Sequence, residues 1–338
     1  MNIRIHLEEL EENILSQYAA LSKNTRGRII EEEKCNIRTD FQRDRDRIIH
    51  SKSFRRLKHK TQVFIAPEGD HYRTRLTHTL EVAQISRTLA RALRLNEDLV
   101  EAIALGHDLG HTPFGHTGEN ALNKLHPNGF KHNEQSLKVV DYLEHRKSRQ
   151  GLNLTYEVRD GILNHTGSGK PATLEGSVVR IADRIAYINH DIDDAIRANI
   201  IKREELPRDC LDVLGEYHGE RINIMILDVI KNSLDKDKIS MSEEVGYYTE
   251  KLRDFMFNRV YLNKRAKTEE EKAEYIIEQL YNYYINNYFK LPKEHRRQYK
   301  KSNITREDIV CDYIGGMTDR YVVNLVKEIF IPKPWQKY

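Results

Sequence analysis

Apolar residues recur every three or four positions along almost the whole chain, and this spacing limits the fold more than any other feature of the sequence. Residues three or four positions apart share one face of an α-helix, so the spacing predicts amphipathic helices that pack against one another. Proline, which interrupts helices, accounts for only 8 of the 338 residues. We therefore predict an all-α, mainly helical fold.

Four segments have the clearest helical pattern, and a further helix is expected near the end of the chain. The four segments cover residues 76–94, 97–109, 133–145 and 176–196, and the further helix covers about 305–330. Asn133 is the expected N-cap of the third helix, and Gly176 lies at the start of the fourth.

Two stretches interrupt the helical pattern. Residues 62–74 alternate in polarity and contain a turn-like PEGD, which predicts a loop with a short β-hairpin. Residues 164–176 are rich in Gly, Ser, Thr and Pro, which predicts an irregular loop. No internal repeat or linker divides the chain, so we expect one unit.

The composition argues against several classes of protein. The 55 lysines and arginines nearly balance the 52 aspartates and glutamates, so the formal charge of +3 indicates no general affinity for polyanions. Cys35, Cys210 and Cys311 are far apart, which argues against a disulfide framework and a thiolate zinc site. No apolar stretch is long enough for a signal core or a membrane span. We expect a soluble, cytoplasmic protein.

Residues 104–119, ALGHDLGHTPFGHTGE, contain a close group of ionisable side chains. His107 and Asp108 end an apolar helix, where a carboxylate beside an imidazole needs a compensating partner such as a divalent cation. His78 and Asp183, each on an apolar helix, can complete a set of two imidazoles and two carboxylates. This mixed set suits Mn²⁺, Mg²⁺, Fe²⁺, Co²⁺, Ni²⁺ or Zn²⁺. The alternative is ordinary packing, because single histidines and His-Asp pairs are common outside metal sites.

His111, His116 and Glu119 follow the His-Asp pair in a segment that contains Gly and Pro. The chain can therefore leave the helix and fold both histidines over the open side of the metal. Glu119 stands three residues after His116, on the same helical face, and a carboxylate bonded to an imidazole raises its basicity. This spacing predicts a general acid/base couple. A helix cap formed by Thr117, with Glu119 in the first turn, fits the same positions equally well.

The helix that carries Asp183 also has a polar stripe. Asp183, Tyr187 and Asp191 are four residues apart, so they line one face, and Arg184 lies beside the first of them. Arg75, one turn before His78, offers a guanidinium fork suited to phosphate. We predict that a long anionic group lies across this face. For Arg184 the alternative is an ion pair with Asp183 or Asp191.

Cations are concentrated in residues 41–64, FQRDRDRIIHSKSFRRLKHKTQVF. Taken alone, this segment is a solvated charged face or a nucleic-acid patch, with its alternating Arg and Asp paired internally. Lys60, Thr61 and Gln62 differ, because they enter an apolar run where unpaired polar groups are unfavourable. We predict that Gln62 contacts a sugar or a base.

Seven motifs together resemble one family. They are RDRDRIIHSKSFRRLKHKTQVF, HYRTRLTHTLEVA, GHDLGHTPFGHTGE, HNEQS, VRDGILNHTG, ADRIAYINHDIDDA and DYIGGMTDRY. Over nearly its whole length the chain is similar to the HD-domain deoxynucleoside triphosphate (dNTP) triphosphohydrolases, which include the deoxyguanosinetriphosphate triphosphohydrolase-like proteins of bacteria. The vertebrate SAM-and-HD-domain dNTPase is a more distant match.

The resemblance implies a metal-dependent HD-domain phosphohydrolase fold. It also implies one unit over residues 1–338, in which an HD core at about 60–200 carries the N-terminal segment 1–59 and a helical C-terminal region 201–338.

The resemblance assigns roles to the site residues. It implies metal binding by His78, His107, Asp108 and Asp183. The implied catalytic residues are His111, His116, Glu119 and His132. The implied substrate contacts are Gln62, Arg75, Arg184, Tyr187 and Asp191. His165 also matches the family pattern, but no independent physical argument gives it a role.

The implied activity is hydrolysis of a dNTP at the α-phosphorus to a deoxynucleoside and inorganic tripolyphosphate, with Mg²⁺ on the triphosphate. The family forms homo-oligomers, and nucleotides or single-stranded DNA act as effectors of some members. Two alternatives stay open. One is an HD phosphohydrolase that acts on another nucleotide, such as a monophosphate. The other is a nucleic-acid-binding or regulatory HD protein, for which the basic segments 41–64 and 296–301 argue.

Overall fold

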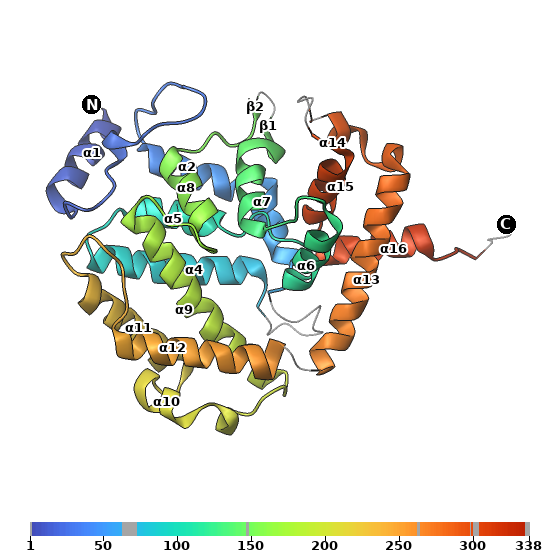
Figure 1. Ribbon diagram of the computed structural model, residues 1–338. Helices are drawn as coiled ribbons and strands as arrows, with labels where there is room; N and C mark the ends of the chain where they lie inside the picture. The colour runs from blue at the N-terminus through green and yellow to red at the C-terminus, as the bar shows by residue number, and fades with distance from the viewer. Residues whose placement is uncertain are drawn as a thin grey trace.

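Helices form nearly all of the regular structure of the chain (Figure 1). The computed structural model describes residues 2–62, 73–146, 149–261, 264–297, 299 and 304–334, and the side chains of 146 and 264–267 are not described. The first eight α-helices are α1 Ile3–Ile14, α2 Asp40–Ile49, α3 Lys52–Arg56, α4 Arg75–Ala92, α5 Glu97–Gly106, α6 Gly115–Leu125, α7 His132–Lys138 and α8 Tyr156–Asn164.

The remaining helices are α9 Leu174–Arg197, α10 Arg208–Leu214, α11 His218–Ser233, α12 Glu243–Met256, α13 Lys264–Asn286, α14 Lys293–Arg297, α15 Arg306–Gly315 and α16 Asp319–Phe330. Two short strands, β1 His145–Arg146 and β2 Arg149–Gln150, form an antiparallel pair. The prediction of an all-α fold is therefore confirmed.

Helices α4, α5 and α9 form the centre of the molecule. Helix α4 packs against both α5 and α9, and α5 also contacts α2 and α8 (Figure 1). Helix α9 is 24 residues long, and most of its side chains are buried. This arrangement holds the C-terminal end of α5 close to the first turn of α4 and to the middle of α9.

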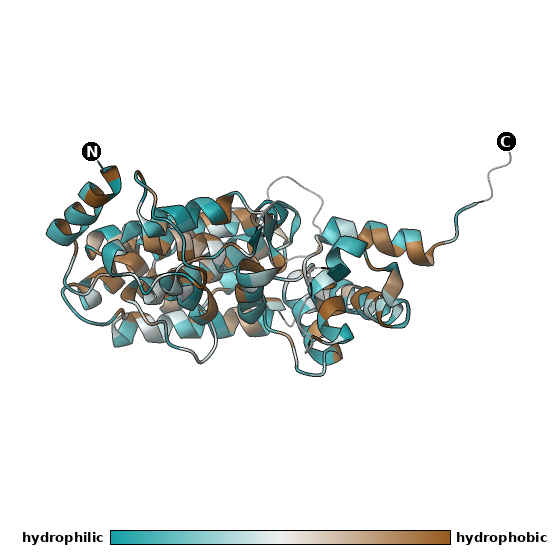
Figure 2. Cartoon of the chain, turned by 90° about the horizontal axis from the view of Figure 1, so that it is seen from above, coloured by the Kyte–Doolittle hydropathy of each residue, from teal (hydrophilic) through white to brown (hydrophobic). Residues whose placement is uncertain are grey.

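The buried apolar side chains form two clusters. The larger cluster draws on α2, α4, α5, α8, α9, α10, α11 and α12. The smaller one draws on α6, α13, α15 and α16, which lie together on one side of the molecule (Figure 1). Seen from above, α16 extends away from the rest of the chain (Figure 2). Helix α6 therefore ties the smaller cluster to the loop that follows α5.

The predicted helix at 133–145 differs from the structure at both ends. Helix α7 begins at His132 after Lys131, and the Asn133 side chain donates to the carbonyl of Leu163 at 2.7 Å instead of capping α7. After Lys138 the chain forms a π-helical turn at Val139–Leu143 and then enters β1. Tertiary contacts with α8 thus override the local capping preference.

Other helix boundaries in the structure differ less from the predicted ones. Helix α9 begins at Leu174, because Thr173 accepts from the backbone N–H of Gly176 at 3.1 Å and caps the helix. The helix expected at about 305–330 is two helices, and the second begins after the N-cap Thr318. The expected hairpin at 62–74 lies mostly outside the described residues, although Thr61 and Thr74 form an antiparallel bridge.

Cys35, Cys210 and Cys311 form no disulfide with one another. Within the described part of the chain, no helix combines the length and the apolar character that crossing a membrane requires.

Candidate active site

Four side chains from three central helices meet at one point. His78 lies in the first turn of α4, His107 caps the end of α5, and Asp108 follows it. Their ligand atoms lie within 4.8 Å of one another. Asp183 Oδ1, from the middle of α9, is 3.1 Å from His78 Nε2 and 3.8 Å from His107 Nε2. The structure therefore brings together the four residues that the sequence nominated as metal ligands.

The ring of His107 is oriented to donate a lone pair. Its Nδ1 donates to the carbonyl of Ala104 at 2.6 Å, which leaves Nε2 unprotonated in the neutral ring. That Nε2 is buried without a hydrogen-bond partner among the described residues, and it lies 3.7 Å from Asp108 Oδ1. A buried lone pair that faces carboxylates is unfavourable without a cation between them. The donor set therefore fits a divalent metal ion.

The carboxylates of the cluster stay ionised. Burial alone would raise the pKa of Asp108, but His107 and Arg75 hold it well below its usual range. Burial also raises the pKa of Asp183, but the hydrogen bond from His78 and the nearby His107 lower it to about 2. Both aspartates are therefore ready to bind a cation at neutral pH.

Arg75 contacts the metal cluster directly. Its guanidinium donates to Asp108 Oδ2 at 2.6 Å, and both side chains are buried. The prediction placed Arg75 near His78 as a fork for phosphate. The structure places Arg75 there, and one of its guanidinium nitrogens already donates a hydrogen bond to Asp108.

A second cluster of histidines adjoins the first. The His111 ring stacks on His132 with 4.8 Å between ring centroids, and the His116 ring lies 5.3 Å from His111. The Nε2 atoms of His132 and His165 are 3.2 Å apart. Asp108, His132 and His165 have ligand atoms within 4.8 Å of one another. Asp108 therefore belongs to both clusters, and His165, for which the sequence supplied no physical role, is part of the site.

Glu119 binds a different histidine more closely than expected. Its carboxylate accepts from His132 Nδ1 at 2.9 Å and from the His132 backbone N–H at 2.8 Å, whereas His116 Nδ1 is 3.4 Å away. Burial raises the pKa of Glu119, but the bonds to His116 and His132 hold it far below its usual range. The i, i+3 spacing correctly placed His116 beside Glu119. The shortest hydrogen bonds of Glu119, however, are to His132, which lies 13 positions further along the chain.

Helix α7 fixes the turn that carries Asp108. The Ser136 hydroxyl donates to the carbonyl of His107 at 2.7 Å and accepts from the N–H of Gly110 at 2.9 Å. A Cβ atom at Gly110 would lie 2.1 Å from the backbone nitrogen of Ser136. Only glycine allows this approach, so the turn is held against α7 by shape and by hydrogen bonds.

The C-terminal region holds the loop between α5 and α6. Phe114 has a left-handed backbone with φ of 61°, and its N–H donates to Asp319 Oδ1 at 2.9 Å. Asp319 Oδ2 accepts from the N–H of Thr61 at 2.9 Å and also from the Thr61 hydroxyl. Sequence reasoning missed Asp319 as a functional candidate, although it lies within the quoted motif DYIGGMTDRY.

A buried lysine joins the same two regions. The Lys60 ammonium donates to the carbonyl of His111 and to the carbonyl of Gly315, the latter at 3.0 Å. Burial and the nearby Arg56 lower the pKa of Lys60 to about 7. Lys60 thus links the backbone of a site histidine to α15. The sequence marked it only as a polar residue in an apolar run.

The family resemblance implies that Arg184, Tyr187 and Gln62 contact substrate. The Arg184 guanidinium forms an ion pair with Glu250 of α12 at 2.6 Å, and not with Asp183 or Asp191. Burial raises the pKa of Tyr187 to about 12. The buried Oε1 of Gln62 has no hydrogen-bond partner within the described residues.

Asp191, the last residue of the predicted stripe, has an unexpected partner. Its carboxylate accepts from the hydroxyl of Tyr261. Burial raises the pKa of Asp191 to about 6, although the hydrogen bond from Tyr261 acts in the opposite direction. Tyr261 follows α12 in the sequence, so local spacing gave no sign of this contact.

Two family models match the chain. The HD domain model matches residues 75–188, and a phosphohydrolase-associated domain model matches residues 239–328. The first range begins with α4 and ends within α9, so it contains all four candidate metal ligands.

Similar proteins extend the match to nearly the whole length. A deoxyguanosinetriphosphate triphosphohydrolase-like protein of Caldanaerobacter subterraneus subsp. tengcongensis is 63% identical over 335 residues, which cover 99% of this chain and 98% of the relative. A protein of the same name from Clostridium perfringens strain SM101 is 52% identical over 98% of this chain and 99% of the relative. A third, from Clostridium tetani, is 48% identical over 98% and 97%.

A solved structure shares the fold. A phosphohydrolase from Bacteroides thetaiotaomicron has a TM-score of 0.53 and 17% identity, and the match covers 84% of this chain and 67% of that one. The matched domain, the helical fold and the His/Asp donor set define a metal-dependent HD-domain phosphohydrolase. Within that class, the full-length matches show that the chain belongs to the deoxyguanosinetriphosphate triphosphohydrolase-like family.

Proposed function

We propose that this protein hydrolyses deoxynucleoside triphosphates to a deoxynucleoside and inorganic tripolyphosphate. One observation carries the proposal: Asp108 belongs at once to the metal cluster and to the histidine cluster. A phosphate held between the two clusters would meet a cation on one side and proton-transferring groups on the other. The names of the full-length relatives support a purine deoxynucleotide as one substrate.

His78, His107, Asp108 and Asp183 would hold the metal. When bound there, a divalent ion supplies Lewis acidity and lowers the pKa of a coordinated water. Arg75 and Arg184 would bind the phosphate oxygens. Tyr187, Asp191 and Gln62 would contact the sugar, as the family resemblance implies.

The histidine cluster would bind the α-phosphate and move the proton. Burial lowers the pKa of His111 well below its usual range, so its ring is neutral and donates a single hydrogen bond to a phosphate oxygen. Water adds to the α-phosphorus as the bond to the 5′ oxygen breaks, and the proton that the water loses would replace the one that His116 gives. His116, oriented by Glu119, would give a proton to that oxygen, and His132 would fix Glu119.

The direct test is to identify the phosphate product. The protein is incubated with each dNTP and with GTP, singly and in mixtures, with Mg²⁺ or Mn²⁺. We expect tripolyphosphate and a deoxynucleoside. Orthophosphate or pyrophosphate would assign the protein to another HD phosphohydrolase activity. A lack of product in every mixture, together with DNA affinity that falls steeply with salt, would favour a binding role.

A further inference from the structure

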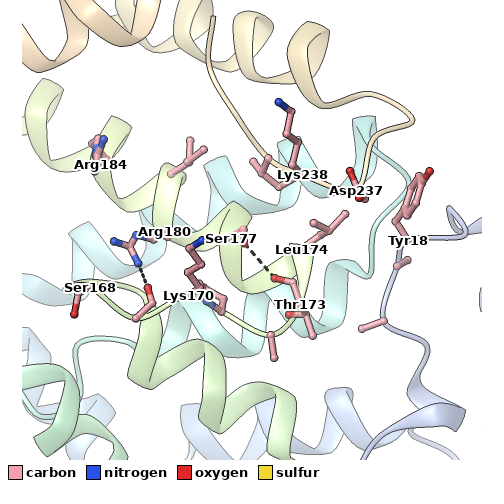
Figure 3. Close-up of a pocket in the computed structure, with 17 residues that line it drawn as sticks. Tyr18, Ser168, Lys170, Thr173, Leu174, Ser177, Arg180, Arg184, Asp237 and Lys238 are labelled. Carbon is pink, nitrogen blue, oxygen red and sulfur yellow. Dashed lines mark hydrogen bonds between the residues drawn. The ribbon is translucent and has the colours of Figure 1, made fainter. Parts of the chain in front are cut away.

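A large cavity, called here the α9 pocket, runs along the N-terminal half of α9. Its volume is about 1010 Å³, which is ample for a small-molecule ligand. Its walls are α9, the loop 168–173, residues 237–239 between α11 and α12, and residues 18–20. Arg184 lies at one end and Tyr18 at the other (Figure 3). The pocket therefore ends at the residue that follows the candidate metal ligand Asp183.

The charged residues of this pocket are mostly basic. Its lining contains Lys170, Arg180, Arg184 and Lys238 but only one acidic residue, Asp237. Lys170 and Lys238 are exposed, and neither forms an ion pair with any described residue. Several uncompensated cations around one cavity favour an anionic ligand.

Arg180 keeps its charge available to such a ligand. Its guanidinium donates to the carbonyls of Gly167 and Gly169 and, at 3.4 Å, to that of Asn164. These partners are neutral, so they fix the side chain without neutralising it. They also hold the loop that forms one wall of the pocket. The first turn of the 24-residue α9, which follows Thr173 in the pocket wall, adds a partial positive charge.

At the end of the pocket opposite Tyr18, Arg184 is held by a carboxylate that a ligand could replace. Glu250 binds Arg184 at 2.6 Å and Arg253 at 2.8 Å. The Arg184 and Glu250 side chains are 40% and 38% exposed, so their ion pair is open to solvent and weak. A phosphate that approaches Arg184 would compete with Glu250.

The pocket lies where the phosphate chain of the proposed substrate would extend. Tyr187 and Asp191 follow Asp183 toward the C-terminal end of α9, whereas Arg180 and Ser177 precede it by about 4.5 and 9 Å at 1.5 Å per residue. With the sugar near Tyr187 and the α-phosphorus at Asp183, the outer phosphates point toward Arg184 and Arg180. We propose that the α9 pocket binds inorganic tripolyphosphate, the phosphate product of the proposed reaction. This inference rests on the proposed function.

Direct binding of tripolyphosphate tests the inference without turnover. Equilibrium dialysis with labelled tripolyphosphate is done on the metal-loaded protein at saturating Mg²⁺, so that the ligand does not strip the site metal. The variant Lys170→Ala/Lys238→Ala removes two exposed cations of the pocket. We expect its affinity to fall by at least about tenfold, because charge-assisted bonds to phosphate are lost. The control Lys231→Ala/Lys236→Ala removes the same charge outside the pocket and should change affinity less than about threefold.

A second variant predicts the opposite change. Glu250→Gln removes the carboxylate that competes for Arg184, so tripolyphosphate should bind several-fold more tightly. Equal affinities of the pocket variant and the lysine control would overturn the inference, and so would a Glu250→Gln protein that binds no better than the native one.

The two proposals can fail separately. If no dNTP yields tripolyphosphate but the binding changes occur as expected, the proposed function fails and the pocket stands as a polyphosphate site. If tripolyphosphate is produced and the pocket variant binds it normally, the pocket inference fails and the function stands.

Discussion

At the scale of single residues, solvent exposure separates the roles of histidines that are close in sequence. The His107 side chain is 1% exposed and points a lone pair at two carboxylates, whereas the His116 side chain is 78% exposed. The first suits a metal ligand, which must exclude competing water. The second suits a group that exchanges protons with substrate and solvent.

Substitution of the two histidines should therefore have different effects. His107→Ala should lose the bound metal, because one donor of four is gone. His116→Ala should keep the metal and lose turnover by about 10²-fold or more, the usual scale for an acid/base group. Metal content by atomic emission and turnover of the best dNTP check both results. A His116→Ala protein with near-normal turnover would remove that role from His116.

The buried carboxyl of Asp191 should make stability depend on pH. Its pKa is raised from 3.8 to about 6, so the folded state holds this proton to a higher pH than the unfolded chain does. The free energy of unfolding therefore falls as the pH rises from 3.8 through 6, by about 3 kcal/mol for 2.2 pKa units. Asp191→Asn keeps an acceptor for Tyr261 and removes this dependence.

Urea unfolding of native protein and Asp191→Asn at pH 4 and pH 8 provides the measurement. We expect similar stabilities at pH 4 and a more stable variant at pH 8. The difference between the two proteins isolates this carboxyl from the other titrating groups. A native protein that gains stability relative to the variant at pH 8 would show that Asp191 is stabilised in its ionised form.

At the scale of elements, the loop between α5 and α6 is hydrogen-bonded to a helix far away in the sequence. Asp319 opens α16 and accepts hydrogen bonds from Thr61, on one side of the site, and from Phe114, in the loop that presents His111 and His116. The left-handed backbone of Phe114 is unfavourable on its own, so it needs such support.

Loss of the Asp319 carboxylate should weaken both stability and turnover. Asp319→Ala leaves buried donors unpaired, so we expect the free energy of unfolding to fall by about 2–4 kcal/mol. Asp319→Asn keeps one acceptor oxygen and should lose less. Turnover should fall with little change in KM, because Asp319 positions the histidines without contacting substrate.

Thermal unfolding and steady-state kinetics test these effects against Asp212→Ala, an exposed acidic residue of α10. If the two Asp319 variants unfold like the control and turn over normally, the loop does not depend on α16.

At the scale of the whole molecule, the candidate metal site joins helices that are distant in sequence. Helices α4, α5 and α9 each contribute donors, and these helices also form the centre of the larger hydrophobic cluster. We therefore expect an ion bound there to stabilise the fold.

Removal of the metal should lower the melting temperature. A ligand present at 100 times its Kd contributes about 2.7 kcal/mol to stability. We expect chelation to lower the Tm of native protein by several degrees and to leave the Tm of Asp183→Ala unchanged. Differential scanning calorimetry with and without chelator measures both. An equal shift in the two proteins would place the stabilising ion elsewhere.

The sequence by itself determined the helical fold and indicated most of the residues of the candidate site. Apolar spacing predicted α4, α5 and α9 because a helix that buries one face repeats that face every three to four residues. The residue types of His78, His107, Asp108 and Asp183 indicated a metal, because such groups are unfavourable in apolar helices without a cation.

Only the tertiary structure decided which partners these residues have. Glu119 pairs most closely with His132, Arg184 with Glu250, and Asp319 with Phe114. Local spacing can identify neighbours within a helix turn, but these pairs are joined by packing between elements tens to hundreds of residues apart. The direction of a side chain across such a contact depends on how whole helices pack against each other. No local sequence pattern encodes that packing.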